Sequence, residues 1–154
     1  MNKLNVLIII IFVAIIAWLG FSKINKKEEV PAPIVEEKSE KITYNNTDVD
    51  HIVVDLPFPG AVTGKEFKVM GKARAFYFEG SFPIDVLDSQ GKILVQTYAT
   101  AQGEWMVDAF VPFEANVKVP ETYIGPATLV LHKDNASGLP EHDASMSFPF
   151  TIEY

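Results

Sequence analysis

The stretch from His51 to Gly71, HIVVDLPFPGAVTGKEFKVMG, contains two runs rich in β-branched residues around a corner rich in proline and glycine. Ile52, Val54 and Leu56 share one face of the first run, because side chains along a strand alternate between its two faces. The corner at residues 57–60, PFPG, ends this run, since proline and glycine interrupt regular strands. The stretch therefore predicts two short strands joined by a sharp turn.

The same two-residue period continues to the end of the chain. The last run alternates most clearly, with Met146, Phe148 and Phe150 on one face. The segments predicted as strands are His51 to Leu56, Glu66 to Arg74, Gly80 to Leu87, Lys92 to Ala99, Glu104 to Phe113, Thr122 to His132 and Ser145 to Tyr154. About seven short strands separated by turns are typical of an all-β, antiparallel β-sandwich. We assign this domain to residues 48–154.

The N-terminal part of the chain has a different composition. Val6 to Leu19 is an unbroken apolar run, and the wider segment from Leu4 to Phe21 contains one polar residue, Asn5. At ~1.5 Å per residue, a helix of this length nearly spans the ~30 Å hydrocarbon core of a bilayer. We predict an uncleaved transmembrane anchor at residues 1–22, followed by a charged, proline-containing linker at residues 23–47.

Charge and cysteine content exclude several classes of function. Residues 45–154 carry seven Lys and Arg against fifteen Asp and Glu, which gives this part of the chain a formal charge of −8. Nucleic acid is therefore not expected as a partner, because phosphate binding needs a basic face. The chain has no cysteine, which removes disulfides, thiolate catalysis and cysteine-based zinc sites.

The run from Ile52 to Phe76 resembles the opening of the immunoglobulin-like domain of bacterial spore germination proteins. The shared features are a P-x-P-G-A corner at 57–61, a V-x-G-x-A-R step at 69–74 and a D-x-x-G turn at 88–91. The resemblance covers roughly residues 50–154. It implies an immunoglobulin-like sandwich that lies outside the cytoplasm and is often attached to the membrane. These motifs concern corners, turns and core positions, so they specify a fold rather than a ligand.

No pattern of catalytic or cofactor-binding residues is present in the sequence. The serines lack a G-x-S-x-G elbow, and no glycine-rich phosphate loop occurs. His51, His132 and His142 are widely separated, so a shared metal site is not expected. The loop after His132 offers carboxylates at Asp134, Glu141 and Asp143 as weak calcium candidates, but it does not match a calcium-loop pattern. We therefore predict neither an enzyme nor a bound metal or cofactor.

Aromatic residues are the sequence candidates for binding a partner. Phe76, Tyr77 and Phe78 are consecutive, so a period of two leaves at least one of them on the outer face. Phe110 alternates away from Trp105 and is the fourth candidate. We expect a non-catalytic module of the cell envelope that binds an envelope protein or a cell-wall glycan. The alternatives are a glycan-binding accessory domain that uses the aromatic residues and a calcium-stabilised adhesin that uses the acidic loop.

Overall fold

The computed structural model describes residues 41–154, and the predicted anchor at residues 1–22 lies outside them. Within residues 41–154 no helix is long and apolar enough to cross a membrane. The described elements are β1 (Thr43–Asn45), β2 (Ile52–Leu56), β3 (Val62–Thr63), β4 (Glu66–Ala73), β5 (Ser81–Leu87), β6 (Ile93–Ala101), β7 (Val111–Lys118), β8 (Gly125–His132), a 3₁₀ turn (Pro140–His142) and β9 (Ser145–Ile152). The all-β class predicted from the alternation is confirmed.

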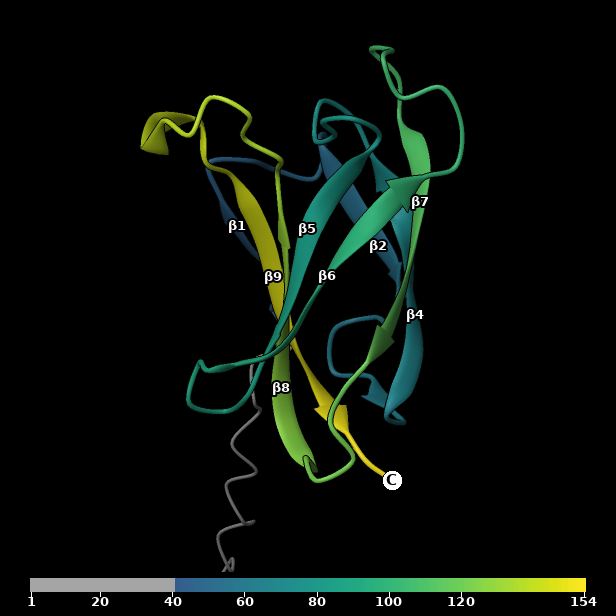
Figure 1. Ribbon diagram of the computed structural model, residues 1–154, viewed down its shortest axis with the longest axis vertical. Coiled ribbons are helices and arrows are strands. Elements are labelled where there is room, and N and C mark those ends of the chain that lie inside the picture. The colour runs from purple at the N-terminus through teal and green to yellow at the C-terminus, as the bar shows by residue number, and fades with distance from the viewer. Residues whose placement is uncertain (1–40) are drawn as a thin grey trace, which may run out of the picture. The chain divides into compact units, whose positions relative to one another are not determined.

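The strands form one curled sheet in the order β1-β9-β8-β5-β6-β7-β4-β2, with β3 added to β9. All pairings are antiparallel except that of β3 with β9, which is parallel. Among residues 41–154, strand pairing joins the two halves only where Thr100 and Ala101 of β6 pair with Glu114 and Phe113 of β7. In Figure 1, β2, β4 and β7 form one half, while β1, β9, β8 and β5 belong to the other.

The core lies between the two halves, where their inward-facing side chains meet. Phe82 of β5 contacts Phe113 of β7 edge to face, with ring centroids 5.0 Å apart. Phe67 of β4 meets Phe150 of β9 in the same way at 5.4 Å. Such pairs add about 0.5–1.5 kcal/mol beyond the area that they bury. The alternation along β4 and β9 therefore gives each half one apolar face and places the two faces against each other.

Two short strands lie in stretches that the sequence did not predict as strands. β1 falls within residues 23–47, the range assigned to the linker, and pairs with β9 through Thr43 and Ser147. β3 follows the proline corner and pairs with the end of β9 through Val62 and Thr151. Strands of two or three residues carry too little periodicity to be recognised in a sequence, so only their pairing partner defines them.

The fifth predicted strand is displaced along the chain. The prediction placed it at residues 104–113, whereas β7 runs over Val111–Lys118 and residues 102–110 form a loop. The register of β7 is set by β4, since Lys118 lies opposite Glu66 and Val111 lies opposite Ala73, the last residue of β4. No strand of the described part of the chain is left to pair with residues 104–110, so their apparent alternation does not make a strand.

Candidate functional site

Four connections gather at one end of the sheet, uppermost in Figure 1, which we call the loop end. They are residues 46–51, 74–80, 102–110 and 133–144. Hydrogen bonds join three of them: the Arg74 amide to the His51 carbonyl at 2.9 Å, the Asp134 amide to the Phe76 carbonyl at 3.0 Å, and the Asn46 side-chain amide to the Asp143 carbonyl at 2.9 Å. Loops held by a rigid sheet are common positions for binding residues.

The aromatic run in the loop between β4 and β5 is divided between the core and the surface. Phe76 is 1% exposed and packs edge to face on Phe82, so it is not available to a partner. Tyr77 is half-buried, and its hydroxyl donates a hydrogen bond of 2.7 Å to the carbonyl of Val111. Burial raises the pKa of Tyr77 to about 12. Phe78 is 45% exposed, so it is the most exposed of the three.

A tight turn fixes the position of Phe78. Reciprocal hydrogen bonds of 3.0 and 3.1 Å join the backbone of Phe78 to that of Ser81. The two residues between them, Glu79 and Gly80, have φ angles of 51° and 77°, as in a type I′ turn. A left-handed conformation at Glu79 costs about 1 kcal/mol or more, and strain of this kind is frequent at functional sites.

The loop between β6 and β7 lies against this turn. The indole ring of Trp105 contacts Gly80, where an added Cβ would come within 3.3 Å of the Trp105 Cδ1 atom. Met106 and Val107 follow and are 72% and 42% exposed. We call Phe78, Trp105, Met106 and Val107 the tip patch. Methionine and aromatic side chains are enriched where proteins contact one another, so the tip patch has the composition of an interface.

Phe110, the fourth aromatic candidate, is half-buried, with basic side chains from the end of β4 and the residue after it near its ring. The Lys72 ammonium lies 5.2 Å from its ring centroid, and the Arg74 guanidinium carbon lies 5.7 Å away. These distances allow cation–π attraction of about 0.5–1 kcal/mol at an exposed position. Phe110 therefore anchors the end of the 102–110 loop to β4 and is not an open part of the tip patch.

The acidic loop between β8 and β9 is organised by its own side chains. Asn135 donates from its amide to the Leu139 carbonyl at 2.8 Å and to a carboxylate oxygen of Asp143 at 2.7 Å. Ser137 accepts the Leu139 amide and lies 3.0 Å from Nδ1 of His142. In the part of the chain that the structure describes, no three His, Asp or Glu residues lie close enough to hold a metal ion. Asp134, Glu141 and Asp143 are thus not grouped around one point.

Two of the histidines are brought to one place. His51 and His142 both line a pocket of about 190 Å³ between residues 46–51, 74–76 and 133–144. The Nδ1 atom of His51 is held by Asp48 at 2.7 Å, so the ring orientation is set locally. His132 lies elsewhere, on β8, where its Nε2 atom is 3.1 Å from a carboxylate oxygen of the buried Asp85.

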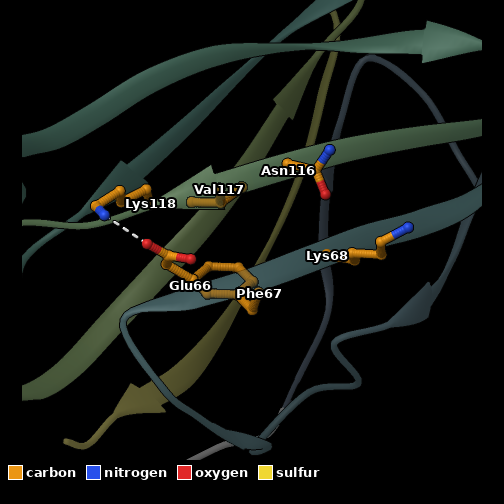
Figure 2. Close-up of a pocket in the computed structure, with 6 residues that line it drawn as sticks. All are labelled: Glu66, Phe67, Lys68, Asn116, Val117 and Lys118. Carbon is orange, nitrogen blue, oxygen red and sulfur yellow. Dashed lines mark hydrogen bonds and ion pairs between the residues drawn. The ribbon is translucent and has the colours of Figure 1, made fainter.

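A second hollow, of about 500 Å³, lies away from the loop end on the paired strands β4 and β7. Glu66 and Lys118 lie directly opposite each other and form an ion pair of 2.5 Å, shown in Figure 2. Lys68 pairs with Glu114 beside them. The charged side chains of this hollow are already paired with each other, so fewer of them are free to bind a ligand. We therefore take the apolar tip patch as the better candidate site.

The sequence prediction did not identify most of the tip patch as a candidate surface. It placed Trp105 and Val107 in the strand predicted at residues 104–113, whereas they belong to a loop. One signal was present: Met106 and Val107 are adjacent apolar residues, which breaks the alternation of a half-buried strand.

Comparisons with known proteins agree with this fold. No curated protein matches the chain. One solved structure with a related shape is CopC from Methylosinus trichosporium OB3b, with 19% identity, a TM-score of 0.42 and coverage of 67% of this chain and 94% of that protein. The model of the Gmad2 family, described as the immunoglobulin-like domain of bacterial spore germination, matches residues 51–139, more than half of the chain. This confirms the resemblance noted in the sequence: the chain belongs to the family of immunoglobulin-like domains of bacterial spore germination.

Proposed function

We propose that this chain is a non-catalytic interaction module of the bacterial cell envelope that binds another envelope protein through its tip patch. The observation that carries the proposal is the exposure of Phe78, Met106 and Val107 at the loop end, where a hydrogen-bonded turn fixes Phe78 and Trp105 lies against that turn. Apolar side chains on a fixed backbone lose little conformational entropy when a partner covers them, so more of the burial free energy becomes affinity. Tight binding through such a patch needs no catalytic group.

The proposal includes the membrane anchor. Residues 4–21 would hold the domain at the cell membrane, and residues 23–47 would separate it from the bilayer. The family context supports a position outside the cytoplasm. Protease added to intact cells should then remove the domain, and alkaline extraction should leave the full-length chain in the membrane fraction. Protection from the protease would contradict the proposed side of the membrane.

The partner can be captured with a photo-crosslinking amino acid placed at Met106 of the full-length chain in native envelopes. Ile124 is a matched control, because it is 67% exposed but lies in the connection between β7 and β8, at the opposite end of the sheet in Figure 1. We expect a discrete protein adduct from position 106 and none from position 124, identified by mass spectrometry.

A second arm uses Met106→Asp, which should remove that adduct when the crosslinker stands at Val107. Ile124→Asp should leave the adduct unchanged. Adducts of equal yield from positions 106 and 124, or no protein adduct from position 106, would refute binding through the tip patch. Capture of cell-wall glycan instead of a protein would replace the proposed partner with a carbohydrate.

A further inference from the structure

One edge of β6 is open along most of its length. β5 pairs with β6 from one end to the other, but β7 meets β6 only at Thr100 and Ala101. The Gln102 amide donates to the Pro112 carbonyl of β7 at 2.7 Å, so even-numbered residues of β6 direct their backbone groups toward that side. Below the junction the two strands separate (Figure 1), and no described strand pairs with the groups of Gln96 and Tyr98 there.

The other open edges in the described sheet carry features that discourage pairing. β1 has three residues, and β2 contains Asp55 and an irregularity between Val54 and Leu56. The free parts of β4 and β7 carry Glu66, Lys68 and Lys118. Short length, bulges and charge are the usual protection of a sheet edge. The stretch 95–99 of β6, VQTYA, has no charge, proline or glycine.

We propose that this edge pairs antiparallel with the same edge of a second copy of the chain. The domain carries a formal charge of −8, which opposes contact between two copies over most of its surface, but the stretch 95–99 brings no like charges together. A second copy therefore meets no added charge repulsion at this edge.

The two ends of the open edge also fit a two-fold axis at Thr97. At one end, β7 occupies the edge from Thr100 onward. At the other end, Leu94 is an extra residue between the pairs of Val86 with Val95 and Leu87 with Ile93, and such a bulge bends the strand. With Thr97 opposite Thr97 of the second copy, Leu94 of each copy lies opposite Thr100 of the other. The bulge at Leu94 therefore bends each strand away at the position where β7 of the other copy already occupies the edge.

In this register Gln96 of each copy lies opposite Tyr98 of the other, which gives two equivalent pairs. Both residues direct their backbone groups to the open edge, so the two pairs exchange hydrogen bonds. A hollow of about 400 Å³, lined by Tyr98, Thr100 and Glu114 among others, lies where β6 and β7 separate. It leaves space for the second copy's β6 where that strand begins.

The absence of cysteine from the chain allows a direct test. Thr97 would form a non-hydrogen-bonded pair across the axis, with Cα atoms about 4.5 Å apart, which suits a disulfide. The full-length Thr97→Cys variant should therefore form a covalent dimer under mild oxidation. Thr100→Cys is the control: the axis would place its two copies about 20 Å apart at ~3.3 Å per residue. We expect at least about tenfold more covalent dimer from Thr97→Cys, because sulfurs at the control distance cannot meet.

A second variant separates pairing from chance collision. Adding Gln96→Lys to Thr97→Cys should reduce the dimer to the control level, because a lysine protects a sheet edge. Sedimentation of the unaltered full-length chain should show a dimer that Gln96→Lys converts to monomer. Equal dimer from Thr97→Cys and Thr100→Cys, a monomeric unaltered chain, or a disulfide from position 97 to a different protein would each overturn the proposal.

Discussion

The hydroxyl of Tyr77 donates a hydrogen bond of 2.7 Å to the carbonyl of Val111, and this contact joins the 74–80 loop to the first residue of β7. Tyr77 follows Phe76, which is in the core, and precedes Phe78, which is in the tip patch. The hydrogen bond thus fixes the 74–80 loop to β7 at the point where the chain passes from the core to the surface. Its removal should weaken the domain without changing the side chains that a partner would meet.

Tyr77→Phe should lower the free energy of unfolding by about 1 kcal/mol, since a half-buried carbonyl loses its partner while the ring is kept. Urea denaturation measures the change. Tyr98→Phe serves as the control, because Tyr98 is 57% exposed and its hydroxyl makes no hydrogen bond within residues 41–154. A loss as large in Tyr98→Phe would show that the Tyr77 hydrogen bond is not the cause.

High pH should destabilise the domain through the same residue. Burial raises the pKa of Tyr77 from 10.0 to about 12, so the folded state favours the neutral phenol. The stability that this group contributes is fully present below pH 10 and is lost as pH rises through about 12. Ultraviolet titration of the five tyrosines should show a late ionisation step that Tyr77→Phe removes. Ionisation of every tyrosine near pH 10 would contradict the burial of Tyr77.

Gly71→Ala should be one of the most damaging small substitutions in the domain. An added Cβ would lie 2.2 Å from the carbonyl oxygen of Val53 and 2.7 Å from Cζ of Phe113, so the backbone of β2 would have to move. Overpacking of this kind costs about 1–3 kcal/mol or more. Thermal unfolding should show a large fall in the melting temperature. Gly64→Ala is the matched control, since its nearest contact is 3.3 Å away, and an equal loss there would exclude the steric explanation.

Glu79→Asn should stabilise the domain. Glu79 has a φ of 51° in the first central position of its turn, where asparagine before glycine is the preferred pair. Relief of this strain should add about 0.5–1 kcal/mol to the free energy of unfolding. Glu121→Asn removes the same charge from another loop and should change stability by less than about 0.5 kcal/mol. A gain of the same size in both variants would indicate that charge, not backbone conformation, is responsible.

Some features of the fold, such as the buried face of a strand, follow from local patterns in the sequence. The alternation of Phe148, Phe150 and Ile152 predicts the buried face of β9, because a strand places every second side chain on the same side. The same reasoning fails for residues 104–110, whose alternation is incomplete and which have no strand opposite them within residues 41–154, since β4 ends at Ala73. Periodicity describes one strand at a time, whereas register depends on a neighbour that can be distant in the chain.

The sequence by itself determined the all-β class, the inward faces of the long strands and the family to which the domain belongs. Each of these depends on local periodicity or on turns whose residues are adjacent in the chain. Only the tertiary structure decided that Phe76 is buried and Phe78 exposed, that Trp105 lies on Gly80, and that the edge of β6 stays open. Those outcomes depend on which segments meet in space, because a side chain is exposed or buried only according to what covers it.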